Sequence, residues 1–457
     1  MPHLSPVSEL ASLNRRQLLK CGAGAVGAYF LPRTSQAEQA RRDAAPAKRA
    51  IFIFLQGGIS QYESWDPKPE APSAYRGEFQ PIDTNVAGTR LSEHLPLLAQ
   101  QAHRFNLIRS VYQPTADHIN ATHMLLTGYS LPGASIEGKN RNANPTLGAV
   151  VAKFREGTSL GLPGYVCVPH RDQFGHRLHY GSAAYLGSAY DPFDSGMLPE
   201  LATGAFEIPA NLSLHKELST GRIDQRLDLL GRLDRMGISA KAGRAAGKED
   251  PFLHNAYEML SHGSAERAFD LNQEPVELRK RYGDHGMGQE AILARRLAEA
   301  GVPFTMVNFS LNQVKGQDWD THVDNCGLLK RELLPPMDRA VSALLEDLDE
   351  RGLLDTTLVC VVSEFGRTPR ITPDGGRDHW PNVYSLMIAG GGLKRGQVLG
   401  ASTRAGDEPL DRPVHIYDVL ATIYHQMGVP AGEVLRDLQG RPLPVLASGT
   451  PIPELLA

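Results

Sequence analysis

The chain has 457 residues, of which 41% are hydrophobic and 21% are charged, and its formal net charge is -4. This is the composition of a soluble globular protein, and the length suits one large α/β domain with insertions or two to three domains. A small negative charge gives no electrostatic attraction to nucleic acid or to an anionic membrane, so we expect neither as a partner.

Residues 1–40 are predicted to be an export signal and linker. The segment 14–20 reads NRRQLLK and resembles the twin-arginine export motif, and a Gly/Ala-rich stretch follows it. No other stretch approaches the roughly 18 consecutive apolar residues that a transmembrane helix needs. We therefore expect a mature protein that is periplasmic or secreted, without a transmembrane segment.

Three cysteines remain after this segment, namely Cys167, Cys326 and Cys360. Their odd number favours buried thiols over a disulfide framework. No two of them have the spacing of a metal-binding pair.

The first predicted strand, 51–55, is followed by Gly57 and Gly58. Glycines at this place allow positive φ or the close approach of another backbone. They suit either a cradle for an anionic substrate or a plain tight turn. Residues 91–103 have apolar residues at helical spacing and are predicted to be a helix.

A strand over 105–111 is predicted to lead into a helix over 115–128, with Asp117 and His118 near its start. The unpaired N–H groups of a helix N-terminus favour anions, so His118 is a candidate catalytic residue. The alternative makes Asp117 an N-cap and His123 a satisfied helix histidine.

The middle of the chain departs from regular α/β alternation. After a predicted helix over 144–155 and a strand over 164–168, residues 170–283 combine an irregular stretch with polar amphipathic segments. We interpret them as a helical or irregular cap insertion within one domain that covers 50–450.

Alternation returns with a helix over 289–300 and a strand over 303–309. Asp320 and His322 follow this strand two residues apart, so in an extended loop both side chains point the same way. They are candidate metal ligands. A capping Asp beside a surface His is the alternative.

A helix over 327–350 leads to the strand 357–362, whose apolar run indicates burial on both faces. The loop beyond it carries Glu364, Arg367, Asp378 and His379. Strand 384–389 and helix 413–428 follow. In open α/β sheets, ligands bind beyond the carboxyl ends of strands. The alternative is structural, with Glu364 paired to Arg367 and Asp378 to His379.

Four loops thus bring glycines, carboxylates and imidazoles to one edge of a parallel sheet. Such a set suits a divalent cation, with zinc or manganese favoured and calcium or magnesium compatible. The metal would lower the pKa of bound water and hold an ester oxygen. Glu364 is a ligand or general base, and the fork of Arg367 suits a substrate oxyanion. The predicted metal ligands are Asp320, His322, Glu364 and His379.

Several motifs resemble a family of exported bacterial proteins, domain-of-unknown-function family 1501 (DUF1501). They include LQGGISQYESWDPKP, HMLLTGY, WDTHVDN, SEFGRTP and GRDHWPNVYSLMIAGGG, and they extend over nearly the whole mature chain. The resemblance implies the alkaline phosphatase and sulfatase superfamily. That superfamily has an α/β fold with a central, mostly parallel sheet between helices and a metal site at its carboxyl edge.

The chain departs from the superfamily at several positions. Gly57 and Gly58 replace its paired aspartates, His118 stands where its Cys or Ser nucleophile would be, and Thr122 replaces its Arg. By contrast, Ser363 to Gly366 resembles its S-D-H-G motif, with Glu364 in place of Asp. One half of a two-metal site therefore remains in altered form.

We expect a metal-dependent hydrolase of an anionic sulfate or phosphate ester, on a small molecule or a glycan, that uses metal-activated water. The alternative is a catalytically inactive superfamily member that binds an anionic ligand, a glycan or a partner protein.

Overall fold

The computed structural model describes residues 44–131, 143–155, 161–169, 181–212, 220–235, 251–309, 319–430 and 432–457. The predicted export signal, 1–40, lies outside them. Ala45–Ala457 forms one compact unit, and all that follows concerns this unit. In the described part of the chain, no helix is both long and apolar enough to cross a membrane.

The core of the unit is a nine-stranded, mostly parallel sheet. Strand β11 runs antiparallel to both of its neighbours, while the pairs β1–β7, β1–β8 and β5–β7 are parallel. The sheet order is β12 (Val398–Leu399), β4 (Phe105–Tyr112), β11 (Tyr384–Gly390), β8 (Thr357–Val362), β1 (Arg49–Phe54), β7 (Phe304–Asn308), β5 (Tyr165–Val168) and β6 (Phe193–Asp194), with β15 (Val414–His415) beside β4.

The central strands are buried on both faces because helices cover both sides of the sheet. Strand β8 is buried at every position, as its apolar run predicts. Phe52 and Phe54 of β1 belong to the core on one face, and Ile51 and Ile53 belong to the core on the other. This alternation follows the period of two residues in a strand.

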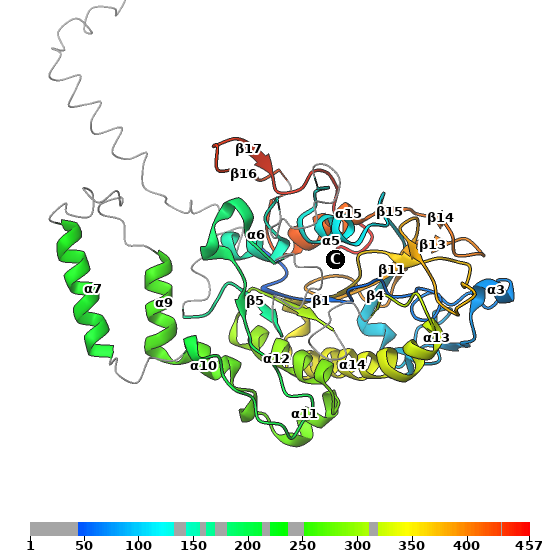
Figure 1. Cartoon of the computed structure of the whole chain (residues 1–457), viewed down its shortest axis with the longest axis horizontal. Helices are drawn as coiled ribbons and strands as arrows, with labels where there is room; N and C mark the ends of the chain where they lie inside the picture. Colours follow the sequence, from blue (N-terminus) through cyan, green and yellow to red (C-terminus); the bar gives the residue numbers. More distant parts are fainter. Residues whose placement is uncertain are drawn as a thin grey trace, which may run out of the picture. The chain divides into compact units, whose positions relative to one another are not determined.

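Helices form a layer on each face of the sheet (Figure 1). Helices α12 (Gly286–Ala300) and α14 (Leu334–Glu350) line one face, and α5 (His118–Thr127), α6 (Leu147–Phe154) and α15 (Ile416–Gln426) line the other. The predicted fold class, a mostly parallel sheet between helices, is confirmed.

The helix predicted over 91–103 was wrong. Leu91 lies in the short strand β3 (Arg90–Ser92), and Pro96 begins the four-residue helix α4 (Pro96–Ala99). Proline has no N–H and clashes with the preceding turn, so a helix cannot run through this position without a break. The three cysteines are free; Cys167 and Cys360 are buried and Cys326 is partly buried.

The stretch predicted as an insertion contributes to the same unit. Its strand β6 pairs with β5 and forms the edge of the sheet, and helices α10 (Ser264–Phe269) and α11 (Val276–Tyr282) pack on α12. Helices α7 (Thr220–Arg235) and α9 (Pro251–His262) precede them. Apart from short 3₁₀ helices, the other described elements are α3 (Ser73–Arg76), β2 (Pro81–Asp83), α13 (Asn325–Leu328), the π-helical turn Leu329–Leu333, β9 (Gly366–Arg367), β10 (His379–Trp380), β13 (Ala401–Ser402), β14 (Pro409–Asp411), β16 (Val434–Arg436) and β17 (Pro442–Pro444).

Candidate metal centre

The loops that follow β1, β4, β7 and β8 meet at the carboxyl edge of the sheet. Parallel strands end at the same edge, so loops that are distant in sequence come together there. The structure brings together every residue that the sequence nominated for the site: Gly57, Gly58, His118, Asp320, His322, Glu364, Arg367 and His379. Within the described part of the chain, these contacts involve no residue of the stretch 181–283.

The carboxylate of Asp320 lies at the middle of this group. Its Oδ1 is 3.1 Å from Nε2 of His379 and 3.1 Å from Nε2 of His322. Its Oδ2 is 3.2 Å from Nε2 of His118. The Nε2 atoms of His322 and His379 are themselves 3.0 Å apart. Three imidazoles therefore direct the same ring atom toward one carboxylate.

The other nitrogen of each ring faces an oxygen acceptor. Nδ1 of His118 is 2.8 Å from Oε1 of Glu364, and Nδ1 of His322 is 2.9 Å from Oδ1 of Asp378. Nδ1 of His379 is 2.8 Å from the carbonyl oxygen of Ala116. Metal-binding histidines commonly donate their second N–H to a carboxylate or a backbone carbonyl, which fixes the tautomer that exposes the ligating nitrogen.

His118, Asp320 and His379 each offer a ligand atom, and the three atoms lie within 4.8 Å of one another. Imidazole nitrogen with carboxylate oxygen is a donor set for zinc, manganese or a similar cation, so the residues fit the metal that the sequence predicts. This group differs from the predicted ligand set, Asp320, His322, Glu364 and His379, because it contains His118 and lacks both His322 and Glu364. His118 faces Asp320 directly, while Glu364 lies behind His118 and contacts its Nδ1.

Charges at the centre perturb the pKa values of two groups. Burial raises the pKa of the Asp320 carboxyl, but hydrogen bonds to His118, His379 and Arg367 outweigh burial, and the net pKa is well below its usual range. Burial lowers the pKa of His118, but its contacts with Asp320 and Glu364 outweigh this and raise the pKa to about 9. The cluster therefore favours a positive charge between its two carboxylates.

Neighbouring atoms leave no room for a side chain at either glycine after β1. Gly57 has φ of 117°, and a Cβ there would lie 2.3 Å from the backbone nitrogen of Asp320. Gly58 has φ of 94°, and a Cβ there would lie 2.8 Å from the ring of Phe365. The N–H of Gly57 also donates to Oε1 of Glu364 at 2.8 Å. The glycines thus allow the loop that carries Asp320 to pack directly on the turn after β1.

The guanidinium of Arg367 is buried and fully engaged. It donates to the carbonyl oxygens of Gly58 at 2.8 Å, Arg377 at 2.9 Å and Trp319 at 3.1 Å, and it pairs with Asp320. These partners join three loops of the site. The sequence left open an ion pair between Glu364 and Arg367 as the alternative to a metal site. In the structure Arg367 pairs with Asp320 instead.

A second buried ion pair supports the same loops. Arg377 and Glu63 have no exposed side-chain surface, and they pair through two hydrogen bonds of 2.5 and 3.0 Å. Glu63 also accepts from Asn325 at 3.0 Å. The sequence does not predict this pair, because neither residue directly follows a predicted strand. The only indication in the sequence is that each motif, QYES and GRDH, contains a charged residue of the pair, Glu63 and Arg377 respectively.

His123 lies apart from the centre. Its Nδ1 is 2.7 Å from the carbonyl oxygen of Tyr129, and its Nε2 accepts from the N–H of Ala143 at 3.3 Å. Burial lowers its pKa to about 4. It is a satisfied helix histidine, and Asp117 caps α5 by accepting from the N–H of Asn120 at 2.9 Å.

Several solved structures are similar to this chain at low identity. The lipoteichoic acid synthase LtaP from Listeria monocytogenes is 9% identical, with a TM-score of 0.39 over 85% of this chain and 74% of that one. The PsFucS1 sulfatase from Pseudoalteromonas sp. is 13% identical, with a TM-score of 0.34 over 87% and 72%. A protein in the alkaline phosphatase superfamily from Vibrio parahaemolyticus is 10% identical, with a TM-score of 0.36 over 84% and 69%. At these scores the likenesses carry no conclusion about activity.

No curated protein matches this chain. Residues 47–456 match the model of the family described as "Protein of unknown function (DUF1501)". The chain therefore belongs to the DUF1501 family, as its motifs predict.

Proposed function

We propose that this protein is an exported, metal-dependent hydrolase of an anionic sulfate or phosphate ester. One observation carries the proposal: three histidines direct Nε2 toward the carboxylate of Asp320, and each has its Nδ1 against an oxygen acceptor. A histidine in an ordinary core bonds to its own nearby partners, as His123 does, and does not converge with other histidines on one carboxylate. Convergence of this kind is the arrangement that metal sites use.

We assign the metal ligands to His118, Asp320 and His379, with His322 as a further ligand from the solvent side. A divalent ion there supplies Lewis-acid chemistry, because it polarises an ester oxygen and lowers the pKa of water. The set is richer in nitrogen than calcium or magnesium sites are, which favours zinc or manganese.

The two sides of the centre differ in exposure, and this gives substrate a direction of approach. The side chains of His322 and Asp378 are 41% and 63% exposed, whereas those of Glu364 and Arg367 are fully buried. Among the described residues, the side of the centre formed by His322 and Asp378 is therefore the more open one, and we assign the approach of substrate to it. Val323, which is 59% exposed, lies beside this approach and offers an apolar surface to the rest of the ester.

We assign Glu364 and Arg367 to positioning rather than to contact with substrate. Glu364 fixes the tautomer of His118, and its position behind the ring leaves it no path to a substrate proton. Arg367 holds the loops of Gly58, Trp319 and Arg377 together with donors that already have partners. Water is the proposed nucleophile, because no Ser, Thr or Cys side chain contacts Asp320 among the described residues.

Turnover by metal-loaded protein tests the proposal. Purified protein would be stripped with chelator, reloaded with zinc or manganese, and assayed on p-nitrophenyl phosphate and p-nitrophenyl sulfate. We expect metal-dependent hydrolysis of one of these esters, its loss in His379→Ala, and its retention in His425→Ala, which removes an exposed histidine of α15. Turnover that persists in His379→Ala would refute the assignment.

The second candidate is a protein that uses the same centre to bind an anionic ligand, a glycan or a partner protein without chemistry. The engaged donors of Arg367 favour it, since an enzyme acting on an oxyanion commonly offers a free guanidinium. Calorimetry with phosphate, sulfate or a sulfated glycan on metal-loaded protein separates the two candidates. Binding that depends on the metal, without turnover of any ester, would support this second function.

Export is proposed from residues 1–40. The variant Arg15→Lys with Arg16→Lys keeps the charge and removes the twin arginines. We expect it to accumulate inside the cell, with the unchanged protein found outside the cytoplasm; equal export of both would refute the assignment.

A further inference from the structure

Three aromatic rings meet at the candidate metal centre, and each contacts the other two. The ring centroids of Phe365 and His379 are 4.4 Å apart, and their planes are stacked at 29°. Those of Phe365 and His118 are 4.9 Å apart at an interplanar angle of 41°. His118 and His379 are 4.2 Å apart, edge to face. Aromatic rings at such separations attract one another in preferred geometries, so the three side chains hold a fixed mutual arrangement.

Phe365 lies on the closed side of the centre. It is 0% exposed, whereas the side chains of His118 and His379 are 12% and 21% exposed. Ser363 holds its backbone by donating to its carbonyl oxygen at 2.9 Å. Gly58 leaves the space that the ring fills, because a Cβ there would lie 2.8 Å from it. Residues other than the two histidines therefore keep Phe365 in place.

The hydrogen bonds of the two imidazoles leave one motion free. Nδ1 of His118 faces Oε1 of Glu364 at 2.8 Å. Nδ1 of His379 faces the carbonyl oxygen of Ala116 at the same distance. Each bond fixes the direction of the N–H group, but the ring can still tilt about that line, and the tilt turns the lone pair of Nε2. A contact with the face of the ring resists this tilt, and Phe365 supplies that contact to both histidines.

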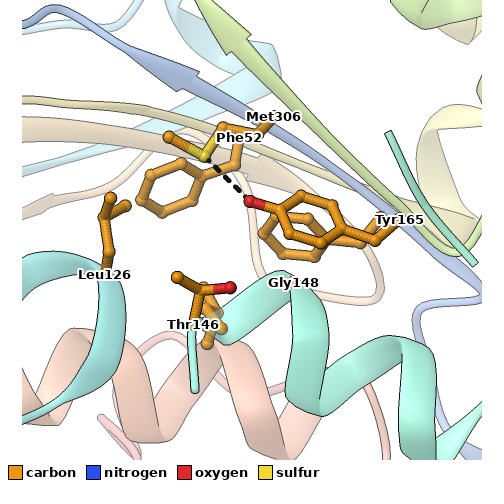
Figure 2. Close-up of a pocket in the computed structure, with 8 residues that line it drawn as sticks. Phe52, Leu126, Thr146, Gly148, Tyr165 and Met306 are labelled. Carbon is orange, nitrogen blue, oxygen red and sulfur yellow. Dashed lines mark hydrogen bonds between the residues drawn. The ribbon is translucent and has the colours of Figure 1, made fainter. Parts of the chain in front are cut away.

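The backbone of His118 is positioned separately, by the packing of α5. Leu126, two turns further along the helix, lines a narrow apolar void with Phe52 of β1 and Met306 of β7, as Figure 2 shows. These side chains place the helix on the sheet at a level about 12 Å along its axis from His118. Helix packing therefore brings His118 to the centre and leaves the tilt of its ring to Phe365.

We propose that Phe365 is a positioning residue of the metal centre. Its ring sets the tilt at which His118 and His379 direct Nε2 toward one ion, and its apolar surface keeps water from that side of the centre. Ligands that packing holds within about 10–20° of the required direction bind a metal more tightly than ligands that must be oriented on binding. This role rests on the metal centre proposed above and adds to it a residue that supplies no ligand atom.

The zinc affinity of the full chain, measured by competition with a chelating dye, tests this role. Phe365→Leu keeps a buried apolar side chain and removes the aromatic face. We expect the zinc affinity to fall by about 10-fold. We also expect the visible absorption spectrum of the cobalt-loaded variant to change, because the two imidazoles turn.

The matched control is Phe79→Leu. Phe79 is also buried and contacts a histidine, His94, at a ring-centroid distance of 4.3 Å, but His94 is no part of the centre. We expect this variant to lose thermal stability through the lost ring contact, as Phe365→Leu does, and to bind zinc as the unmodified chain does.

A folded Phe365→Leu protein with the zinc affinity of the unmodified chain would overturn the role of Phe365 and leave the metal centre itself intact. An unmodified chain that binds no zinc would overturn both. An equal loss of zinc affinity in Phe79→Leu would overturn the role of Phe365, because it would show a general effect of lost packing.

Should Phe365→Leu fail to fold, a crystal structure of the zinc-loaded, unmodified protein decides. We expect both imidazoles to bond zinc through Nε2 with their faces still against Phe365. A structure in which either ring has turned away from Phe365 would contradict the role.

Discussion

The substitution Glu364→Gln tests the candidate metal centre through the buried carboxylate that contacts the proposed ligand His118. Oε1 of Glu364 accepts from Gly57 N and faces His118 Nδ1, both at 2.8 Å, and Oε2 is 3.1 Å from Gly57 N. Glutamine keeps one acceptor oxygen but replaces the other with an N–H₂ group and removes the charge. The Nδ1 proton of His118 then faces at best an uncharged amide oxygen, which holds the proton on Nδ1 less firmly and makes Nε2 a weaker ligand.

Loss of such an outer partner lowers metal affinity by about 10- to 100-fold, or about 1.4 to 2.8 kcal/mol. The assay is competition for zinc between the metal-free protein and a chelating dye. The control is Asp378→Asn, which changes the equivalent partner of His322. Because the Asp378 side chain is 63% exposed, we expect its effect to stay within about fivefold. A folded Glu364→Gln protein that binds zinc as tightly as the unmodified chain would refute the assigned role of Glu364.

Two further predictions concern the loops around the centre, and a third concerns Asp338, a buried carboxyl of α14. Gly57→Ala places a Cβ 2.3 Å from the nitrogen of Asp320, so we expect loss of zinc binding in the same dye assay. Arg367→Lys leaves several buried carbonyl oxygens unpaired, and we expect the free energy of unfolding in urea to fall by about 3 kcal/mol or more. Burial raises the pKa of Asp338 to about 6, although two backbone N–H groups of α4 bond to it. The folded chain therefore binds this proton more tightly than the unfolded chain does. The contribution of Asp338 to stability should decline by about 2 kcal/mol as pH rises from 4 to 7, and the difference in stability from Asp338→Asn should follow it.

The predictions for Gly57 and Arg367 each have a control variant, and each of the three predictions has a result that would contradict it. Gly432→Ala, at a glycine with open space around it, should bind zinc normally, and Arg370→Lys at an exposed arginine should unfold as the unmodified chain does. Normal zinc binding by Gly57→Ala would contradict the close packing of the two loops. Unchanged unfolding of Arg367→Lys, or a difference for Asp338→Asn that does not vary with pH, would contradict the corresponding prediction.

The sequence predicts the sheet and the edge that carries the candidate site, because both depend on local patterns. Buried parallel strands such as β1 and β8 appear as unbroken apolar runs, and their ends mark where polar loops converge. For that reason Asp320, His322 and His379 could be nominated together although they come from distant loops.

The division of roles at the centre depends on three-dimensional packing. Nothing in the sequence shows that His118 turns Nε2 toward Asp320 while Glu364 lies behind it, since this follows from how α5 docks on the sheet. Likewise, the sequence suggests that Arg367 binds a substrate oxyanion. The structure shows that its N–H donors already bond to backbone carbonyl oxygens. The ion pair of Glu63 and Arg377 could not be predicted from the strand ends, because both residues lie several positions beyond a strand and pair only when the two loops fold together.

The most direct test of the central claim is an anomalous-difference map from crystals of zinc-loaded protein. We predict one strong peak at bonding distance from Nε2 of His118, the carboxylate of Asp320 and Nε2 of His379, and no such peak in crystals of Asp320→Ala. A map from zinc-replete crystals with these side chains ordered and no peak among them would contradict the account.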